Sequence, residues 1–297
     1  MKKRENKIPQ IIINLLFCLG SLLFILPFVL IISASFTNEQ SLIAEGYKLI
    51  PSHFSTEAYK YVFKNPQQLL DSYKITIFYS LAATFLGVIV MAMLAYPLSK
   101  PNYKYKKLVT FFIFFTMLFS GGLIPSYIWI TRYLHMGNTV WVYIFPNLVN
   151  AFHVIVIRTF FQGLPQSLTE AAKIDGASEL RIFFKIVIPL SKPVIATISL
   201  LTLLARWNDW NTALIYIKST NLYSLQYLLQ KILREVEFVK NMAESTPIAG
   251  IDMDATQLPS ETIRFAMCMV AAGPMLVVFP FFQKYFAKGL TVGAVKG

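Results

Sequence analysis

The sequence predicts an all-α integral membrane protein, and its composition, hydropathy and charge distribution all support this fold class. Hydrophobic residues make up 56% of the 297 residues, whereas charged residues make up only 14%. A soluble domain carries about 25% charged residues, so this chain has too little polar surface to cover a water-soluble core. Six apolar stretches approach the roughly 20 residues that a helix needs to cross a bilayer. We therefore expect six transmembrane helices in a single domain, residues 1–297.

Each apolar stretch is expected to form one transmembrane helix. The stretches cover residues 11–35, 75–97, 108–130, 139–157, 188–212 and 265–282. The first follows a basic segment at residues 2–4, but it is longer than the apolar core of a signal peptide, so we interpret it as a retained helix. Residues 120–122 and Pro125 interrupt the third, and the fifth becomes polar and aromatic beyond Ala205.

The net charge of +12 lies on one side of this predicted topology. If the N-terminus is cytoplasmic, the inside segments are residues 1–10, 98–107, 158–192 and 283–297. They hold 16 of the 27 Lys and Arg residues but only four of the 15 acids, whereas the outside segments hold 11 of each. This is the positive-inside pattern, which predicts that both termini are cytoplasmic. The basic charge therefore reflects topology, and no nucleic-acid partner is expected.

No catalytic or metal-binding pattern is present in the sequence. It lacks phosphate-binding glycine loops and nucleophile motifs, and its three histidines lie far apart. Cys18 and Cys268 both lie in apolar runs, so no disulfide framework is implied. We expect a chain that is not an enzyme and binds no metal or cofactor itself. Five of the six spans also lack Asp, Glu, Lys and Arg, which argues against an ion-coupled transporter and for an energy source in another subunit.

The segment between the fourth and fifth spans, residues 164–189, carries the most specific pattern. Ser167-x-x-Glu170 is a capping box that predicts a helix start. Residues 175–176, Asp-Gly, predict its end, and Ser178 predicts the start of a second helix. The result is a short surface helix, a sharp turn and a helix leading into the membrane. Such a projection fits a cleft on a partner protein, although an amphipathic surface helix without a partner is the alternative.

The same segment resembles the EAA motif of binding-protein-dependent ABC importer permeases, E-A-A-x3-G-x9-I-x-L-P. Six of the seven fixed positions match, and Ile188 in place of Leu is the one departure. In that family the segment is the coupling helix, which docks in a groove of the ATP-hydrolysing subunit. The resemblance implies that Glu170 is the charged anchor, that Gly176 makes the turn and that the alanines pack closely. The implied coupling residues are Glu170, Ala171, Ala172, Asp175, Gly176, Ala177, Ile186, Ile188 and Pro189.

The resemblance covers most of the chain, which is similar to the smaller, six-helix permease of maltose-type carbohydrate importers. The ending at residues 288–297 looks like the tail of that subfamily, and residues 120–125 and 225–229 look like its branch for complex oligosaccharides. It implies a bacterial cytoplasmic membrane location and three kinds of protein partner. These are a second permease subunit in a heterodimer, two copies of an ATPase subunit that uses ATP and Mg²⁺, and an extracytoplasmic sugar-binding protein.

Two long outer segments, residues 36–74 and 217–264, are expected to contact partners, because loops of this length in a compact domain usually have a function. Simple capping of the helix bundle is the alternative. By resemblance, the second segment is the candidate to enter the sugar cleft of the binding protein.

Polar and aromatic residues of the fourth and fifth spans are candidates for the substrate path. Flat aromatic faces beside amide groups suit a sugar, which presents both C–H patches and hydroxyls. The candidates are Asn147, Asn150, Trp207, Asn208, Asp209, Trp210 and Asn211, repeated at i,i+3 spacing on expected helix faces. An aromatic belt with an Arg206–Asp209 ion pair, and hydrogen bonds between helices, explain these residues equally well.

The most specific interpretation is a permease subunit of an ATP-driven importer for an oligosaccharide. A self-sufficient six-helix channel or facilitator for a small polar solute is the alternative. That alternative explains the topology but not the pattern of capping box, glycine and proline at residues 164–189. A membrane enzyme is disfavoured because the sequence lacks a catalytic constellation.

Overall fold

The computed structural model describes residues 7–245 and 260–294, and its regular secondary structure there is helical apart from one isolated β-bridge between Thr37 and Phe54. The chain divides into two compact units. Unit 1 contains residues 1–66 and 229–274, and unit 2 contains residues 67–228 and 275–297. Residues 246–259 of the predicted outer segment and residues 295–297 of the predicted tail motif lie outside the described residues.

Unit 1 joins the first helix of the chain to the short helices that follow it. It contains α1 (Lys7–Ser35), α2 (Glu39–Glu45), α3 (Glu57–Val62), most of α13 (Leu225–Ser245) and the first part of α14 (Ser260–Ala294). The buried carboxylate of Glu39 accepts hydrogen bonds from the backbone N–H groups of Glu261 (2.9 Å) and Thr262 (2.8 Å). Because the first N–H groups of a helix have no partner within it, Glu39 caps α14 from α2.

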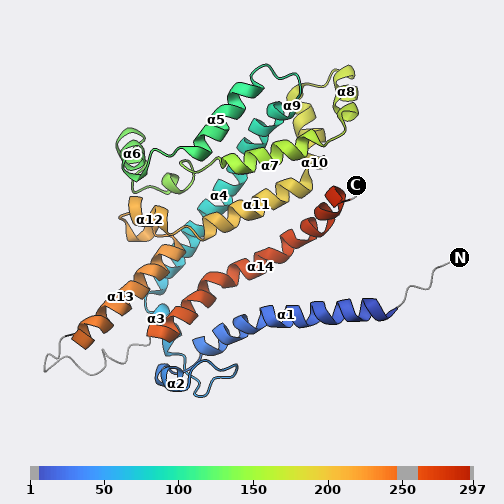
Figure 1. Cartoon of the computed structure of the whole chain (residues 1–297). Coiled ribbons are helices and arrows are strands. Elements are labelled where there is room, and N and C mark those ends of the chain that lie inside the picture. The colour runs from blue at the N-terminus through green and yellow to red at the C-terminus, as the bar shows by residue number, and fades with distance from the viewer. Residues whose placement is uncertain (1–6, 246–259, 295–297) are drawn as a thin grey trace. The chain divides into compact units, whose positions relative to one another are not determined.

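Unit 2 is built on the long helix α4 (Pro66–Ser99), with α7 packed between α5 and α11 (Figure 1). Its other α-helices are α5 (Lys106–Leu118), α6 (Leu123–Ile128), α7 (Ala151–Gln162), α8 (Gln166–Ile174), α9 (Glu179–Ile182), α10 (Ile188–Leu190), α11 (Lys192–Trp207) and α12 (Asn211–Tyr216). Single turns of π-helix occupy η1 (Trp129–Tyr133) and η3 (Phe183–Val187), and 3₁₀ turns occupy η2 (Val140–Tyr143) and η4 (Thr220–Leu222).

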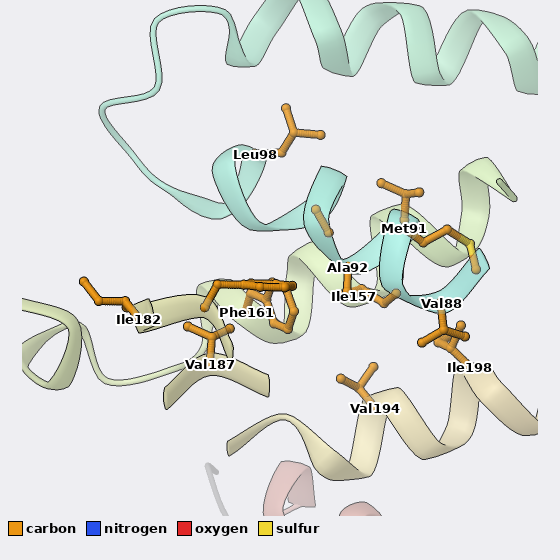
Figure 2. Packing of buried hydrophobic residues seen from close by; sticks show 13 residues of the cluster. Val88, Met91, Ala92, Leu98, Ile157, Phe161, Ile182, Val187, Val194 and Ile198 are labelled. Atoms are coloured by element: carbon orange, nitrogen blue, oxygen red, sulfur yellow. The ribbon is translucent and has the colours of Figure 1, made fainter. Parts of the chain in front are cut away.

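The core of unit 2 lies where α4 meets α7, α11 and the segment from α9 to η3. Figure 2 shows Met91 and Ala92 of α4 with Ile157 and Phe161 of α7, and Val194 of α11 on the other side. Each of these side chains is buried, and burial of one large aliphatic side chain contributes about 1.5–3 kcal/mol. This cluster connects α4, α7 and α11 to the end of α9 and to η3.

Gly87 allows α4 to approach the chain ahead of α7. A Cβ at this position would lie 2.7 Å from the carbonyl oxygen of Leu148. A backbone oxygen cannot move aside as the end of a flexible side chain can, so only glycine fits here without a shift of the chain.

Three of the six predicted spans are continuous helices of sufficient length and hydropathy. They are Gln10–Ser35, Pro66–Ser99 and Ser260–Pro280, which contain or largely cover the first, second and sixth predicted spans. The chain is therefore helical and membrane-spanning as predicted.

The third and fifth spans were wrongly predicted as single helices. In place of 108–130, the helices Lys106–Leu118 and Leu123–Tyr133 meet at 111°. The first helix ends at Leu118, and Gly122, with a φ of +84°, is the N-cap of the second. In place of 188–212, Glu179–Leu190 and Lys192–Trp207 meet at 82° around Ser191. Pro193, in the first turn of α11, starts the new helix direction.

The fourth span, 139–157, was also wrongly predicted as one continuous helix. A single 3₁₀ turn, η2, is followed by irregular chain, and α7 begins only at Ala151. Pro146 has no N–H group for a helical hydrogen bond. The side chain of Asn150 accepts a hydrogen bond from the N–H of His153 (3.1 Å) and so starts α7 as its N-cap.

Candidate coupling site and substrate path

The segment of residues 164–189 folds as a helix, a left-handed turn and a second helix. Gly176 has a φ of +76°; its N–H donates to the carbonyl of Lys173 (3.0 Å), and the N–H of Ala177 donates to the carbonyl of Ala172 (2.9 Å). This pair of bonds is a Schellman motif, which satisfies the last carbonyls of α8. The Ser178 side chain then accepts a hydrogen bond from the N–H of Arg181 (3.4 Å) and caps α9. The predicted turn and second helix are confirmed.

The predicted capping box at the start of this segment is wrong. Helix α8 begins at Gln166 with Pro165 as its N-cap, and no side chain caps it. Ser167 is therefore already inside the helix, where its hydroxyl cannot act as the N-cap partner of Glu170. The proline sets the boundary instead, because the residue at a helix start needs no intrahelical N–H bond.

Most of α8 is exposed, and only Thr169 and Ala172 are partly buried. Ser167, Glu170, Ala171 and Ile174 fall at i, i+3, i+4 and i+7 and are all exposed. The Ile174 side chain is 87% exposed, more than any other large hydrophobic residue in the described part of the chain. The inward-facing Ala172 packs against the buried cluster around α4 and α7.

The nine residues implied by the EAA resemblance divide between these two environments. Glu170, Ala171, Asp175, Gly176 and Pro189 are exposed. The partly buried members pack against the core of unit 2; they are Ala172, Ala177, Ile186 and Ile188. The exposed members are available to a partner, whereas the packed members connect the projection to the membrane helices.

A charged cluster that sequence reasoning missed fastens this projection to the end of α4. The Glu179 carboxylate accepts hydrogen bonds from the hydroxyl of Tyr96 (2.8 Å), from Lys173 (3.0 Å) and from Lys100. The Lys100 ammonium also lies over the Tyr96 ring, 4.3 Å from its centroid. We call these four residues the Glu179 cluster. It joins α8, α9 and the C-terminal end of α4.

The protonation state of Glu179 follows from these contacts. Partial burial raises the pKa of its carboxyl, but the hydrogen bonds from Lys100, Lys173 and Tyr96 outweigh that effect and lower the pKa to about 2. The carboxylate is therefore ionised throughout the physiological range. A pocket of about 200 Å³ lies beside the cluster, between the end of α4 and α8, and both Thr169 and Glu170 line it.

A second polar cluster lies farther along α4. The Tyr79 hydroxyl donates to the carbonyl of Arg206 (2.9 Å), and the Tyr143 hydroxyl donates to the carbonyl of Leu222 (2.8 Å). The two tyrosine rings stack with centroids 4.4 Å apart, and both residues are buried. We call Tyr79 and Tyr143 the tyrosine pair. Since a helix rises 1.5 Å per residue, Tyr79 lies about 30 Å along α4 from the C-terminal end of that helix at Ser99.

The predicted polar face of the fifth span is not formed. Helix α11 ends at Trp207, so the i,i+3 pairs expected on a continuous helix, Trp207 with Trp210 and Asn208 with Asn211, do not share a helix face. Trp207 is 3% exposed and part of the packed interior, whereas Trp210 is 37% exposed. Asn211 is the first residue of α12.

The polar side chains at this helix break hold the chain in its turn. The Asp209 carboxylate accepts hydrogen bonds from the N–H (3.0 Å) and hydroxyl (2.6 Å) of Thr212. Asn208 accepts one from Gln226 (3.2 Å), and the Asp209 carbonyl accepts one from Ser224 (2.9 Å). These contacts explain the polar residues locally, without a ligand.

Asn147 and Asn150 likewise do not form an i,i+3 pair on one helix face, because both precede α7. The carbonyl of Asn147 accepts a hydrogen bond from the Arg206 guanidinium, which links this loop to the end of α11. Among the predicted substrate-path residues, the structure therefore brings Asn147 near the end of α11, and Asn150 acts locally as a helix cap.

The Glu179 cluster left only a weak signal in the sequence. Lys100 belongs to the basic segment that fixes the topology, and Glu179 follows an N-cap serine, but neither pattern says that the two residues meet. They lie 79 residues apart, and only the packing of α9 against α4 brings them together. As to metals, no group of three or more potential ligands gathers within residues 7–245 and 260–294.

Comparison with known proteins identifies the family of this chain. Residues 87–292, more than two thirds of the sequence, match the family described as the inner membrane component of binding-protein-dependent transport systems. The chain belongs to this family. The match includes both the α8–α9 projection and most of the helices of unit 2.

Individual relatives cover nearly the whole chain. Protein LplC of Bacillus subtilis is 40% identical over 96% of this chain and 94% of its own length. The polygalacturonan/rhamnogalacturonan transport system permease protein YtcP of the same organism is 36% identical over 99% of this chain and 100% of its own length. A chain in the crystal structure of a bacterial ABC transporter for import of the acidic polysaccharide alginate is 29% identical, with a TM-score of 0.76 over 96% of this chain and 99% of that chain.

These findings decide between the functions that the sequence left open. The chain is a permease subunit of an ABC importer and a multi-pass protein of the bacterial cytoplasmic membrane. It is a transport component whose ATPase activity belongs to a separate subunit, and a substrate-binding protein serves the same system. A self-sufficient facilitator does not fit this family.

Proposed function

We propose that this chain forms one half of the translocation pathway of an oligosaccharide importer and that its α8–α9 projection is the coupling helix. The observation that carries the proposal is the exposed face of α8, where Glu170, Ala171 and Ile174 project from a helix that is anchored on its other side. A partner that covers this face would remove the Ile174 side chain from water. The partner that the family provides is the ATPase.

Three connections would carry movement of the ATPase into the membrane helices. Ala172 and Ala177 pack directly on the core of unit 2. The Glu179 cluster joins α8 and α9 to the end of α4. The chain from α9 through η3 and α10 leads into α11 across the 82° bend. Displacement of α8 would therefore reach α4 and α11 together.

The proposed assembly has four membrane-associated parts. A second permease subunit completes the pathway as a heterodimer, and two ATPase copies bind ATP and Mg²⁺ while this chain binds neither. We further propose one permease domain, residues 1–297, with six crossings and both termini cytoplasmic, in which the third and fifth crossings are bent helix pairs. The positive-inside charge distribution and the family match support this arrangement.

The proposed substrate is an oligosaccharide delivered by an extracytoplasmic binding protein, with acidic glycans as the first class to test. The support is that a relative at 36% identity is named for polygalacturonan and rhamnogalacturonan, and that the similar solved structure belongs to an importer of alginate. We propose that Asn147, Asn150 and the residues of the α11–α12 break, Trp207, Asn208, Asp209, Trp210 and Asn211, border the path. The Arg206 guanidinium lies in the same region.

A single charge reversal tests the coupling assignment. Glu170 is exposed, so Glu170→Lys should leave the fold intact but place a cation on the docking face. We expect loss of the ATPase during affinity purification of the tagged complex in mild detergent, with the second permease retained. Lys185→Glu, a charge reversal on an exposed residue of η3 away from the exposed face of α8, is the matched control and should keep the ATPase. An ATPase that stays bound equally to both variants would contradict the assignment.

A competition assay tests the substrate class. Uptake of a labelled galacturonan oligosaccharide by proteoliposomes that contain the complete importer and its binding protein should be blocked by unlabelled acidic oligosaccharide and not by a neutral one of equal length. Equal competition by both would reject the acidic class while leaving the oligosaccharide assignment in place.

A further inference from the structure

A groove between α5 and α7 combines three cations with an apolar floor and is not part of the coupling site. Its volume is about 580 Å³, which is in the range of small-ligand sites. Six residues line it, all of them in unit 2: Lys106, Lys107, Thr110, Phe111, Phe114 and Arg158.

The cations in this groove lack acidic partners. No carboxylate within the described part of the chain forms an ion pair with Lys106, Lys107 or Arg158. Arg158 donates one hydrogen bond to the Thr110 hydroxyl across the two helices (3.3 Å). Its Nε atom is buried and has no hydrogen-bond partner in the structure, so the guanidinium is only partly satisfied. Three neighbouring positive charges therefore favour an anion.

The first turn of α5 adds to this positive field. The helix begins at Lys106, has no acidic residue in its first turn, and receives no side-chain hydrogen bond from its N-cap, Tyr105. The N–H of Lys106 donates to the carbonyl of Tyr103 (3.1 Å), and the N–H groups of Lys107 and Leu108, which precede the first bond within the helix, leave a partial positive charge beside the two lysines.

The rest of the groove is apolar, which restricts the kind of anion that fits. Phe111 and Phe114 are 61% and 46% exposed, while Val109 and Ile113 of the same helix face the core. At 1.5 Å per residue, the two phenylalanines lie about 6 and 10 Å along α5 from Lys107. A free phosphate or an acidic peptide would satisfy the cations but leave the phenylalanines uncovered. A molecule with an anionic head and an apolar chain satisfies both.

We propose that the groove of Lys106, Lys107, Thr110, Phe111, Phe114 and Arg158 binds an anionic phospholipid, with its phosphate at the three cations and an acyl chain along the phenylalanines. The chain resides in the cytoplasmic membrane, where such lipids are the surrounding solvent. Basic pockets between transmembrane helices are known to hold anionic lipid headgroups in this way. The bound lipid fills the outer side of the α5–α7 contact that Arg158 and Thr110 bridge.

The test is lipid binding to the full-length chain in mild neutral detergent, followed by native mass spectrometry. Dioleoyl phosphatidylglycerol is titrated against dioleoyl phosphatidylcholine, which has the same acyl chains but no net charge. We expect one phosphatidylglycerol molecule to bind at concentrations that leave phosphatidylcholine unbound. Loss of one cation near a membrane surface should weaken this binding about fivefold.

Two lysines that lie close together in the sequence provide a matched pair. Lys107 is exposed and lines the groove, and Lys104 is exposed and does not. Lys107→Gln should weaken phosphatidylglycerol binding about fivefold, and Lys104→Gln should leave it unchanged, since neither substitution affects a buried contact. Arg158→Gln together with Lys106→Gln and Lys107→Gln should weaken it about a hundredfold.

Three results would overturn the proposal. They are equal binding of both lipids, equal effects of Lys107→Gln and Lys104→Gln, and displacement of the lipid by inorganic phosphate at matched concentration. The last result would mean that the cations bind a free anion and that the phenylalanines contribute nothing. Because this measurement uses neither ATP nor sugar, its outcome is independent of the proposed coupling and substrate assignments.

Discussion

The two polar clusters on α4 differ in exposure, chemistry and place. The Glu179 cluster at the C-terminal end is formed by ion pairs between side chains, and its central carboxylate is 54% exposed. The tyrosine pair, about 30 Å away, is buried and donates its hydroxyls to backbone carbonyls. Ion pairs in partial contact with water exchange partners at low cost, whereas water replaces a lost hydroxyl less readily beside two buried, stacked rings. The first cluster is thus suited to a joint that moves and the second to one that is fixed.

The largest expected effect comes from breaking the left-handed turn at Gly176, which sets the direction of α8 relative to α9. Gly176 has a φ of +76°, which proline cannot adopt, so Gly176→Pro should abolish ATP-coupled uptake while membrane insertion persists. Gly176→Ala meets no neighbouring atom, so its cost is purely conformational. That cost of about 1–2 kcal/mol corresponds to a loss of uptake of about tenfold.

A second glycine serves as the control for this substitution. Gly163 ends α7 at a φ of −82°, which alanine adopts freely, and its added Cβ would lie 3.4 Å from one backbone oxygen. Uptake and ATPase activity measured in proteoliposomes should therefore be nearly normal for Gly163→Ala. Equal losses in the two alanine variants would show that the left-handed turn is not the cause.

Removal of a hydroxyl from the tyrosine pair should lower stability and leave coupling intact. Tyr143→Phe removes the hydroxyl that donates to the carbonyl of Leu222 and should destabilise the fold by about 1–3 kcal/mol. Tyr79→Phe should cost less, about 0.5–1.5 kcal/mol, because the carbonyl of Arg206 still accepts a hydrogen bond from the N–H of Asp209 (3.2 Å). Thermal unfolding in detergent measures this effect. Tyr105→Phe, in an exposed tyrosine of the basic loop, is the control and should not change the unfolding temperature. A fall in the ratio of sugar imported to ATP hydrolysed would contradict the fixed role assigned to this pair.

Neutralising Glu179, at the centre of the Glu179 cluster, should lower coupling and leave stability nearly unchanged. Glu179→Gln keeps the side-chain shape but removes both ion pairs, and because the residue is more than half exposed the loss should be at most about 0.5–1 kcal/mol. We expect little change in the unfolding temperature. The ratio of sugar imported to ATP hydrolysed should fall about two- to fivefold, which is the factor that corresponds to this loss of free energy.

The control for this position is a double-mutant cycle. Lys100→Gln alone should lower the ratio of sugar imported to ATP hydrolysed. Added to Glu179→Gln, it should lower this ratio little further, because the ion pair between Lys100 and Glu179 is already lost. Additive losses would show that the two residues act separately and not through one cluster.

The smallest effect is the pH dependence of this cluster. The pKa of Glu179 in the fold is about 2, below its ordinary value of 4.5, so its contribution to stability is complete above pH 4.5 and is lost as the pH falls toward 2. Import coupling should therefore not vary between pH 5 and pH 8 on account of this residue. The measurement is the amount of sugar imported per ATP hydrolysed, taken for the Glu179→Gln variant and for the unsubstituted chain at each pH. The value for the variant divided by the value for the unsubstituted chain should be constant over that range. A change in this ratio between pH 5 and pH 8 would show that Glu179 titrates there.

The membrane class and the turn at Gly176 followed from the sequence because both depend on local chemistry. Twenty apolar residues favour a bilayer wherever they lie in a fold, and Asp-Gly after a short helix favours a left-handed turn through backbone freedom alone. Family membership also followed, since the spacing from Glu170 to Pro189 is a property of the chain.

The tertiary structure alone decided where helices break and which distant residues meet. Hydropathy averages over a window, so it did not show that Ser191 and the chain ahead of Asn150 interrupt two apolar runs. Nor did it show that the interruption expected at residues 120–122 bends the third span by 111°. It also could not show that Lys100 reaches Glu179 across 79 residues, or that Arg158 of α7 and the lysines of α5 line one groove. Such contacts depend on how helices pack against one another, and that packing is set by the summed shape of many side chains rather than by any local pattern.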